Sequence, residues 1–538
     1  SLARTEQVVR LGQRRFDVVV IGGGITGAGI AREAAQRGLD VALVERDDFA
    51  SGTSSRSSRL VHGGVRYLEH GHLRLVFEAC HERRLLLNIA PHLVHPLRFT
   101  WPVYAGSRIP RWKLRAGLLV YDVLALFRNV APHRGLSARA LAEAEPQLER
   151  QALTGGAQYF DAATDDARLT LATVLDAARA GATVLNHAEV SGLMWTDGRV
   201  SGVHVTDRLG GRTFDVEAAC VVSAAGPWTD SIRKLEDPGA APAVLGSKGA
   251  HIAVPAERVG NRGAVTLLAP DGRVMFVLPA GSCSVIGTTE TDGTVSPDAA
   301  RATRADVDYL LASANRAFPE AKLTTDDVIA AWAGIRPLAA IAHRGDANSA
   351  SREHLVATGP GGVITVTGGK LTTYRVIAED TVRAVLRALH RRAPRSAPDR
   401  APLAGGDIGD LDAAIETARG RTEAVDIAQR LVYAYGSAWT RVWARVERDD
   451  ALARRLVADL PYIEAEVVHA VEDEYACTLA DVLVRRVHVA FETRDHGRGV
   501  APRVAALMAP SLGWTDRGVA LALAEFDAAI ARIFSVDD

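Results

Sequence analysis

The sequence predicts an α/β protein in which a parallel-sheet domain carries a second, mostly antiparallel layer and is followed by a helical C-terminal domain. Three observations predict this class. A β-branched run that ends in glycines opens the chain, strand-like runs recur as far as about residue 370, and helical spacing dominates after residue 406. At 538 residues the chain exceeds one hydrophobic core, because cores stop growing near roughly 250 to 300 residues.

The first element pair is a βαβ unit. Phe16–Ile21 is a short β-branched strand, Ile25–Arg37 has the pattern of a helix, and Val41–Glu45 is a second strand. Two later apolar runs, residues 220–226 and 362–369, also end on glycine. We expect both to be central strands of the same parallel sheet.

The second layer is predicted from strand-like pieces such as Arg273–Pro279 and Ser284–Gly287, with one helix near Ala305–Ala317. The following helical part is preceded by a stretch rich in Arg, Pro, Ala and Gly, which is typical of a linker. The expected division is residues 15–95, 165–232 and 348–390 for the first domain, 96–164 and 233–347 for the second layer, 391–406 for the linker and 407–538 for the helical domain.

Composition limits the function. Lys plus Arg (63) balance Asp plus Glu (64), so no global field favours nucleic acid. The four cysteines form no C-x-x-C pair, which disfavours a zinc site or a redox dithiol and fits a reduced compartment. We expect no spanning segment, because no stretch approaches 18 uninterrupted apolar residues.

A dinucleotide site is indicated by Gly22-Gly23-Gly24-Ile25-Thr26-Gly27, which satisfies G-x-G-x-x-G between a strand and a helix. The first glycine makes the turn, the second admits a pyrophosphate and the third allows close helix packing. Glu45, at the end of the next strand, is placed to accept hydrogen bonds from a ribose. A plain glycine turn is disfavoured, because strand, helix and acid are all present.

The polar loop Ser51–Arg59 favours FAD over a nicotinamide cofactor. Its hydroxyls and backbone N–H groups suit an extended pyrophosphate and ribityl chain. On composition alone the loop fits a flexible surface linker equally well.

The segments His62-Gly63-Gly64-Val65-Arg66-Tyr67-Leu68 and Gly368–Arg375 give the chain a specific resemblance. Together they resemble the FAD-dependent, aerobic glycerol-3-phosphate dehydrogenase family. Matching elements run from about Phe16 to Ala378, whereas the C-terminal third resembles the family mainly in being helical. They include Ala225–Trp228, Lys248–His251, Ile286–Glu290 and Gly334–Leu338. Ala250 stands where the family often has serine, and an N-terminal extension precedes the first strand.

The resemblance implies an FAD-binding domain of the D-amino-acid-oxidase type and a substrate-binding cap. It also implies oxidation of sn-glycerol 3-phosphate to dihydroxyacetone phosphate, with electrons passed to a membrane quinone. The positions expected to bind FAD are Gly22, Gly24, Ile25, Thr26, Gly27, Glu45, Arg46, Thr53, Ser54, Ser55, Ser58, His62, Gly63, Gly64, Ala225, Gly226, Trp228, Gly287, Thr288, Arg336, Gly368, Gly369, Lys370, Leu371 and Thr372.

A phosphate dianion in a half-buried pocket needs cations and hydroxyl donors to replace lost water. Arg66, Arg336 and Lys370 are the main candidates, because each lies in a motif that matches the family. The predicted substrate-binding set is completed by Tyr67, Lys248 and Thr373.

Loss of the C2 hydroxyl proton requires a base with a pKa near neutrality, which histidine provides. His62 is the first choice and His251 the second, since each lies beside glycines. Lys370 is assigned either to the substrate or to stabilising the reduced flavin. The sequence has no G-x-S-x-G elbow and no H-E-x-x-H, so neither a hydrolase nor a metal is expected.

Residues Arg108–Arg128 predict a membrane contact. Four cations and Trp112 adjoin a leucine-rich run, a composition that suits a segment lying in the lipid headgroup region. An ordinary amphipathic helix packed on the cap is the alternative. We expect a cytoplasmic protein bound peripherally to the inner face of the membrane, and a homodimer is compatible with the sequence. The rival functions are a glycerol-3-phosphate oxidase that uses oxygen and a flavin-binding sensor.

Overall fold

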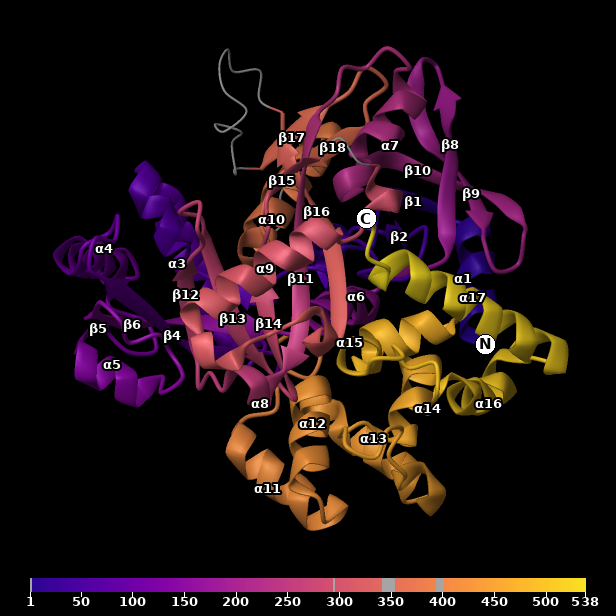
Figure 1. Cartoon of the computed structure of the whole chain (residues 1–538). Coiled ribbons are helices and arrows are strands. Elements are labelled where there is room, and N and C mark those ends of the chain that lie inside the picture. Colours follow the sequence, from indigo (N-terminus) through magenta and orange to yellow (C-terminus); the bar gives the residue numbers. More distant parts are fainter. Residues whose placement is uncertain (1, 294–295, 341–353, 393–400) are drawn as a thin grey trace.

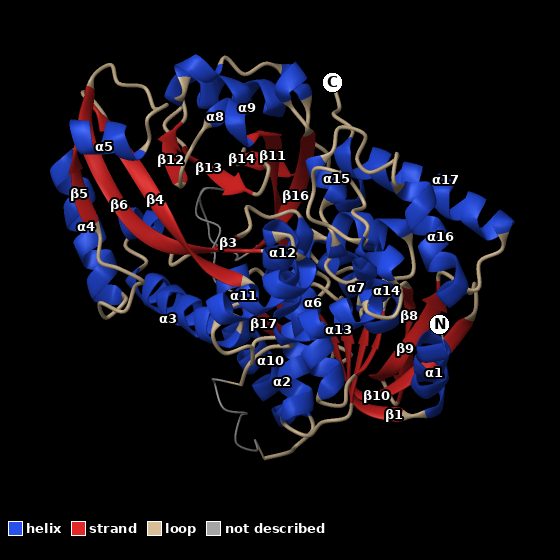
Figure 2. Cartoon of the chain, turned by 90° about the horizontal axis from the view of Figure 1, so that it is seen from below, coloured by secondary structure: helices blue, strands red, loops and turns tan. Residues whose placement is uncertain are grey.

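The computed structural model describes residues 2–293, 296–340, 354–392 and 401–538. Figure 1 shows two β-sheets beside one another and a helical C-terminal part, coloured orange to yellow, packed against them. Figure 2 shows the strands of both sheets in red, with helices covering their outer faces. The arrangement confirms the predicted α/β class with a helical C-terminal domain.

The first sheet is built around β1 (Arg15–Ile21). β1 lies parallel to β2 (Val41–Val44) on one side and to β10 (Thr213–Ser223) on the other, and β10 is parallel to β18 (Ile364–Thr367). The four predicted strands are therefore confirmed as neighbours in one sheet. The remaining strands are β7 (Thr183–Leu185), β8 (Ala188–Thr196), β9 (Arg199–Asp207) and β17 (Leu355–Thr358).

Both faces of the first sheet are buried, which explains why β1 is an almost uninterrupted apolar run. Successive side chains of a strand point to opposite faces. Val18 and Val20 pack in one apolar cluster with α2, α6 and α10, whereas Val19 and Ile21 pack with α1, β8 and β9. These helices are α1 (Leu2–Gln13), α2 (Ile25–Gln36), α6 (Asp166–Arg179) and α10 (Tyr374–Ala388).

The second sheet is mostly antiparallel, as predicted. Toward one end of this sheet, β11 (Val244–Pro255) pairs with β14 (Cys283–Gly287) and β16 (Ala330–Ala339). The predicted helix is confirmed as α9 (Arg304–Ala317), which packs on one face of β11. The other strands are β3 (Leu60–Val61), β4 (Val94–Tyr104), β5 (Arg134–Ser137), β6 (Leu153–Thr164), β12 (Ala264–Leu268), β13 (Val274–Ala280) and β15 (Thr291–Gly293).

The helices α3 (Leu73–Ile89) and α4 (Arg111–Leu124) lie on the side of the second sheet that carries β4 and β6 (Figure 1). Short β3 belongs to a segment that we predicted as part of the first domain, yet it pairs with β6 of the second sheet. The two layers are therefore joined through this strand. The shorter helices are α5 (Ala138–Ala144), α7 (Thr229–Glu236) and α8 (Ala256–Val259).

Buried ion pairs connect the C-terminal domain to the first domain. Asp48 accepts hydrogen bonds from the guanidinium groups of Arg485 and Arg486, and Arg168 of α6 forms a two-pronged pair with Glu474. Removing one partner of such a pair would leave a buried charge without compensation, so both partners are needed where the two domains meet. The helices of this domain are α11 (Leu411–Thr422), α12 (Val425–Tyr435), α13 (Trp439–Val446), α14 (Glu464–Asp473), α15 (Val489–Glu492), α16 (Ala501–Leu512) and α17 (Asp516–Phe534), with a π-helical turn at Asp481–Arg486.

The predicted linker is only partly a linker. Residues 393–400 lie outside the described residues, but Leu403 and Ala404 are buried in one cluster with Leu86 and Ile89 of α3. The prediction is therefore wrong for the end of this stretch, because two apolar side chains there complete a core. None of the four cysteines forms a disulfide.

Candidate active site

The turn between β1 and α2 has the geometry that its glycines require. Gly22 has a φ of 106°, and a methyl group on Gly27 would collide with the carbonyl oxygen of Gly22. Gly24, which precedes α2, offers no side-chain cap to the helix. The first turn of α2 therefore presents N–H groups and a positive dipole end toward an anion.

Glu45 follows β2 and points back to this turn. Its carboxylate accepts the N–H of Gly23 at 2.6 Å and the N–H of Asp47 at 2.9 Å. Burial raises the pKa of Glu45 above its ordinary value. An acceptor held at this strand end fits the ribose hydroxyls of a dinucleotide, so the turn and Glu45 together fit the adenosine half of FAD.

The polar loop Ser51–Arg59 is an ordered bridge between the two sheets. Ser54 Oγ accepts the N–H of Ile25 at 3.0 Å, and Thr53 Oγ1 donates to the carbonyl of Ile335 on β16 at 2.6 Å. Ser58 Oγ lies 2.9 Å from His251 Nε2 on β11. The alternative of a free surface linker is therefore wrong, because the loop connects the glycine turn to the second sheet.

His251 lies on the face of the second sheet that meets this loop. Its ring stacks on Trp332 of β16 with centroids 5.5 Å apart and planes 10° apart. Burial, together with the cationic Arg336 and Arg59, lowers the pKa of His251 to about 3. The imidazole is therefore neutral near pH 7, but a pKa this low also makes it a weaker base than an ordinary histidine.

Arg336 shares this face. Its guanidinium donates to Thr288 Oγ1 at 3.0 Å and to Ser247 Oγ at 3.4 Å. In the β11–β16 ladder Ser247 pairs with Arg336 and His251 pairs with Trp332, which places all four side chains on one side of the sheet. The structure thus brings together a cation, two hydroxyls and a neutral imidazole.

Lys248 corrects one of our predictions. It immediately follows Ser247 on β11, so its side chain points to the opposite face. There its Nζ donates to Asp306 of α9 at 2.7 Å, and the pair lowers the pKa of Asp306. Lys248 is therefore absent from the face that carries Arg336 and His251, and its role in substrate binding is wrong on this geometry.

A second group of predicted residues forms another wall. Thr372 Oγ1 accepts the backbone N–H of His62 and donates to its carbonyl, both at 3.2 Å. Lys370 Nζ lies 3.7 Å from the centroid of the Tyr67 ring, and the rings of His62 and Tyr67 are 6.1 Å apart. The structure therefore joins the two family-like motifs. The side chain of Arg66 lies outside the described residues.

Other predicted cofactor residues border these walls. The indole Nε1 of Trp228 donates to Asp298, and the guanidinium of Arg46 lies 4.9 Å from the Trp228 ring. The remaining positions lie in tight backbone segments, namely Ala225 and Gly226 before α7, Gly287 at the end of β14, Gly368 and Gly369 after β18, and Leu371 and Thr373 before α10. Thr26 and Ser55 belong to the turns described above.

Two polar residues of this region were missed by sequence reasoning. Ser247 lies two positions before Gly249 and four before His251, so strand alternation applied to that motif would have found it. Arg59 lies 3.4 Å from His488 of the C-terminal domain and stacks over Phe491, and no sequence signal indicated this contact.

The fold and the site define a flavin-dependent oxidoreductase. The profile of a family described as "FAD dependent oxidoreductase" matches residues 17–375, and one described as "C-terminal domain of alpha-glycerophosphate oxidase" matches residues 396–519. FAD is the cofactor. The FAD domain is of the expected D-amino-acid-oxidase type.

Similar proteins narrow the class. A "Glycerol-3-phosphate dehydrogenase 2" of Mycobacterium tuberculosis is 39% identical over 98% of this chain and 91% of its own length. The human "Glycerol-3-phosphate dehydrogenase, mitochondrial" is 40% identical over 93% of this chain and 71% of its own. The solved glycerol-3-phosphate dehydrogenase of Bacillus halodurans complexed with FAD is 31% identical, with a TM-score of 0.82 over 99% of this chain and 98% of that one. The chain belongs to the FAD-dependent glycerol-3-phosphate dehydrogenase family.

Proposed function

We propose that the chain oxidises sn-glycerol 3-phosphate to dihydroxyacetone phosphate and passes the electrons to a membrane quinone. The observation that carries the proposal is the shared face of Arg336 and His251, which the loop Ser51–Arg59 connects to the glycine turn. Bound FAD would supply the acceptor for the hydride that leaves C2. The protein must then hold the phosphate, orient C2 and take up the hydroxyl proton.

Arg336 binds the substrate phosphate in this proposal. Thr288 and Ser247 fix the guanidinium plane, so less side-chain entropy is lost when the anion arrives. A bidentate guanidinium and neighbouring hydroxyls are the donors that a dianion needs once its water is removed. Arg66 remains proposed as a second cation on the basis of the sequence.

We propose His251 as the base on the geometry of its ring nitrogens, and a substrate anion beside Arg336 would offset part of the lowering of its pKa. Among the described residues its Nδ1 is buried without a hydrogen-bond partner, whereas Nε2 meets Ser58 Oγ. If Nε2 carries the hydrogen and donates it to Ser58, Nδ1 carries a lone pair and no hydrogen. The ring then has no buried N–H group without an acceptor, which favours this tautomer. We therefore propose that Nδ1 accepts the C2 hydroxyl proton. His62, our first choice from the sequence, stays in the proposal as a residue of the wall that it forms with Thr372 and Tyr67.

Lys370 has two proposed uses. Its ammonium lies against the face of Tyr67, an arrangement that holds a cation in place without neutralising it. The charge then acts either on the substrate phosphate or on the reduced flavin. Thr373 and Tyr67 complete the set of proposed substrate contacts.

The membrane contact rests on α4. Its inner face buries Leu114, Leu118 and Tyr121, whereas its outer face and the residues that follow are apolar and exposed. The exposed side chains are Trp112 (73% exposed), Leu119, Val120, Val123, Leu126 and Phe127 (63% exposed). A helix that is apolar on both faces needs a second apolar partner, and lipid is a partner that a quinone enzyme must meet.

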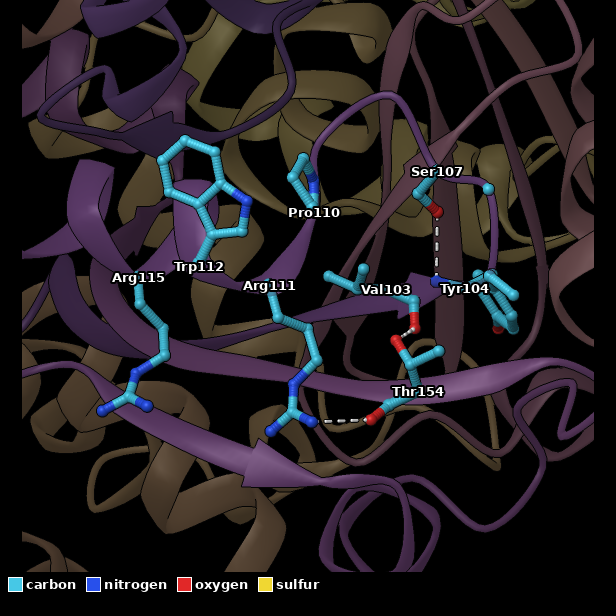
Figure 3. Close-up of a pocket in the computed structure, with 10 residues that line it drawn as sticks. Val103, Tyr104, Ser107, Pro110, Arg111, Trp112, Arg115 and Thr154 are labelled. Atoms are coloured by element: carbon cyan, nitrogen blue, oxygen red, sulfur yellow. Dashed lines mark hydrogen bonds between the residues drawn. The ribbon is translucent and has the colours of Figure 1, made fainter.

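A hollow of about 490 Å³ lies at the start of this helix. Figure 3 shows the side chains of Arg111 and Arg115 extending in one direction and that of Trp112 in the opposite one. Arg111 donates to the carbonyl of Thr154 at 3.0 Å, so one cation of the segment is held by the protein. Cations in the same short segment as an exposed tryptophan suit a surface with anionic headgroups. No helix in the described part of the chain is long and apolar enough to cross a membrane.

The acceptor is tested by comparing electron sinks. In air, the purified enzyme with glycerol 3-phosphate should reduce a quinone analogue and release little peroxide. Peroxide formed in proportion to substrate consumed, with the quinone unreduced, would instead establish an oxidase. The matching C-terminal profile, whose description names an oxidase, makes this comparison necessary. We propose the domain boundaries given above with two changes: β3 belongs to the second sheet, and the linker ends before Leu403.

A further inference from the structure

A buried carboxylate lies beneath the turn His62–Gly64. Asp161 of β6 accepts the backbone N–H of Gly63 at 2.9 Å, and the same oxygen accepts the hydroxyl of Tyr121 at 2.6 Å and a hydrogen bond from Arg83. Three different elements, α3, α4 and β6, supply these side chains. We propose that Asp161, held by Arg83 and Tyr121, is a positioning residue for the wall formed by His62 and Tyr67. The inference rests on the proposed function of that wall.

The carboxylate is fixed by its partners. Asp161, Arg83 and Tyr121 are at most 3% exposed, so each depends on the others for its hydrogen bonds. Arg83 also donates to the carbonyl of Phe160 and to Asn129, which leaves its guanidinium little freedom. Burial raises the pKa of Tyr121 well above its ordinary value, so its hydroxyl stays protonated and donates to Asp161.

Neighbouring side chains pack tightly against the turn His62–Gly64. A methyl group on Gly63 would collide with the Tyr121 hydroxyl and the Cys80 sulfur. Gly64 then adopts a left-handed conformation with φ 79°, and a side chain there would collide with the Tyr67 ring. The anchored N–H of Gly63 therefore sets the direction in which His62 leaves the turn and the place where Tyr67 begins.

The cluster is better explained by positioning than by stability. Replacing a buried ion pair with apolar side chains of similar volume is often neutral or stabilising, so such a pair is weak evidence for a purely structural role. Here the carboxylate of Asp161 accepts the backbone N–H of Gly63, a position at which no side chain fits. Tyr121 also lies on the inner face of α4, whose outer face is the proposed lipid contact.

The test compares two single-hydroxyl deletions. Tyr121→Phe removes the hydrogen bond to Asp161 and keeps the ring. Tyr159→Phe is the matched control, because Tyr159 is also buried and lies edge-on to Tyr121 with centroids 6.2 Å apart. In anaerobic stopped-flow reduction by saturating glycerol 3-phosphate, Tyr121→Phe should slow bleaching by about three- to tenfold, and Tyr159→Phe by less than about twofold.

Three measurements distinguish a positioning effect from a general loss of stability. For Tyr121→Phe we expect unchanged FAD content, a Tm within a few degrees of that of Tyr159→Phe, and a shifted absorption band of the oxidised flavin. Bleaching of Tyr121→Phe at the wild-type rate, or an equal loss in Tyr121→Phe and Tyr159→Phe, would overturn the inference. Asp161→Asn, in which the amide carbonyl can still accept from Gly63, should give a larger defect of the same kind. Failure of the wild-type flavin to bleach would refute the proposed function instead, so the two failures are distinguishable.

Discussion

Arg336 and Lys248 provide a test that depends only on which face of a strand a cation occupies. They lie at adjacent rungs of the β11–β16 ladder, and only Arg336 shares a face with His251. Replacing Arg336 with Ala removes a charge-assisted contact to the phosphate, which is worth about 1.5 to 3 kcal/mol. The KM for glycerol 3-phosphate should rise about 10- to 100-fold if it reports binding, because each 1.4 kcal/mol is about tenfold.

Lys248→Met is the matched control. It removes one partner of a buried ion pair, but Thr303 still donates its N–H and hydroxyl to Asp306 at 3.0 and 2.9 Å. The free energy of unfolding should fall by about 3 kcal/mol, the low end for breaking such a pair, with KM nearly unchanged. Steady-state assays with a soluble dye acceptor and thermal melts measure both. If Lys248→Met raises KM as much as Arg336→Ala, the assignment of faces is wrong.

The remaining predictions concern the base, acid stability and lipid. His251→Ala should slow anaerobic flavin reduction by about a hundredfold or more, and a larger loss in His62→Ala would return that role to His62. In the folded protein the pKa of His251 is about 3, whereas in the unfolded chain it is about 6.5. The unfolded chain therefore binds a proton first, and the free energy of unfolding falls as the pH drops from about 6.5 to about 3. His251→Gln should flatten the decline in Tm. Trp112→Ser should weaken binding to anionic vesicles several-fold. Trp195→Ser, at the other exposed tryptophan, is the control and should leave binding unchanged. Equal binding by the two variants would argue against a lipid contact through α4.

The parallel sheet and the glycine turn could be predicted because their signals are local. A β-branched run, a glycine turn and an acid at the next strand end each reflect the backbone they occupy. The alternation of β11 was equally available in the sequence. The match of the whole motif to the family predicts Lys248 in the site, whereas the alternation of the strand sends Lys248 and His251 to opposite faces.

Other features depend on contacts between distant segments. Asp161 is a lone acid in a strand, and its role follows only from α3 and α4 closing over it. Leu403 and Ala404 occur in a stretch with linker composition, yet tertiary packing buries them. The short strand β3 is two residues long, too short for any periodic signal, although it joins the two sheets.

The visible spectrum of the purified protein tests the central claim most directly. The account predicts the absorption of bound oxidised FAD and its bleaching when glycerol 3-phosphate is added without oxygen, with dihydroxyacetone phosphate formed in equal amount. Unphosphorylated glycerol at the same concentration should leave the spectrum unchanged, because it offers no anion to Arg336. Protein that carries FAD but is not reduced by glycerol 3-phosphate, or is reduced equally well by glycerol, would contradict the account.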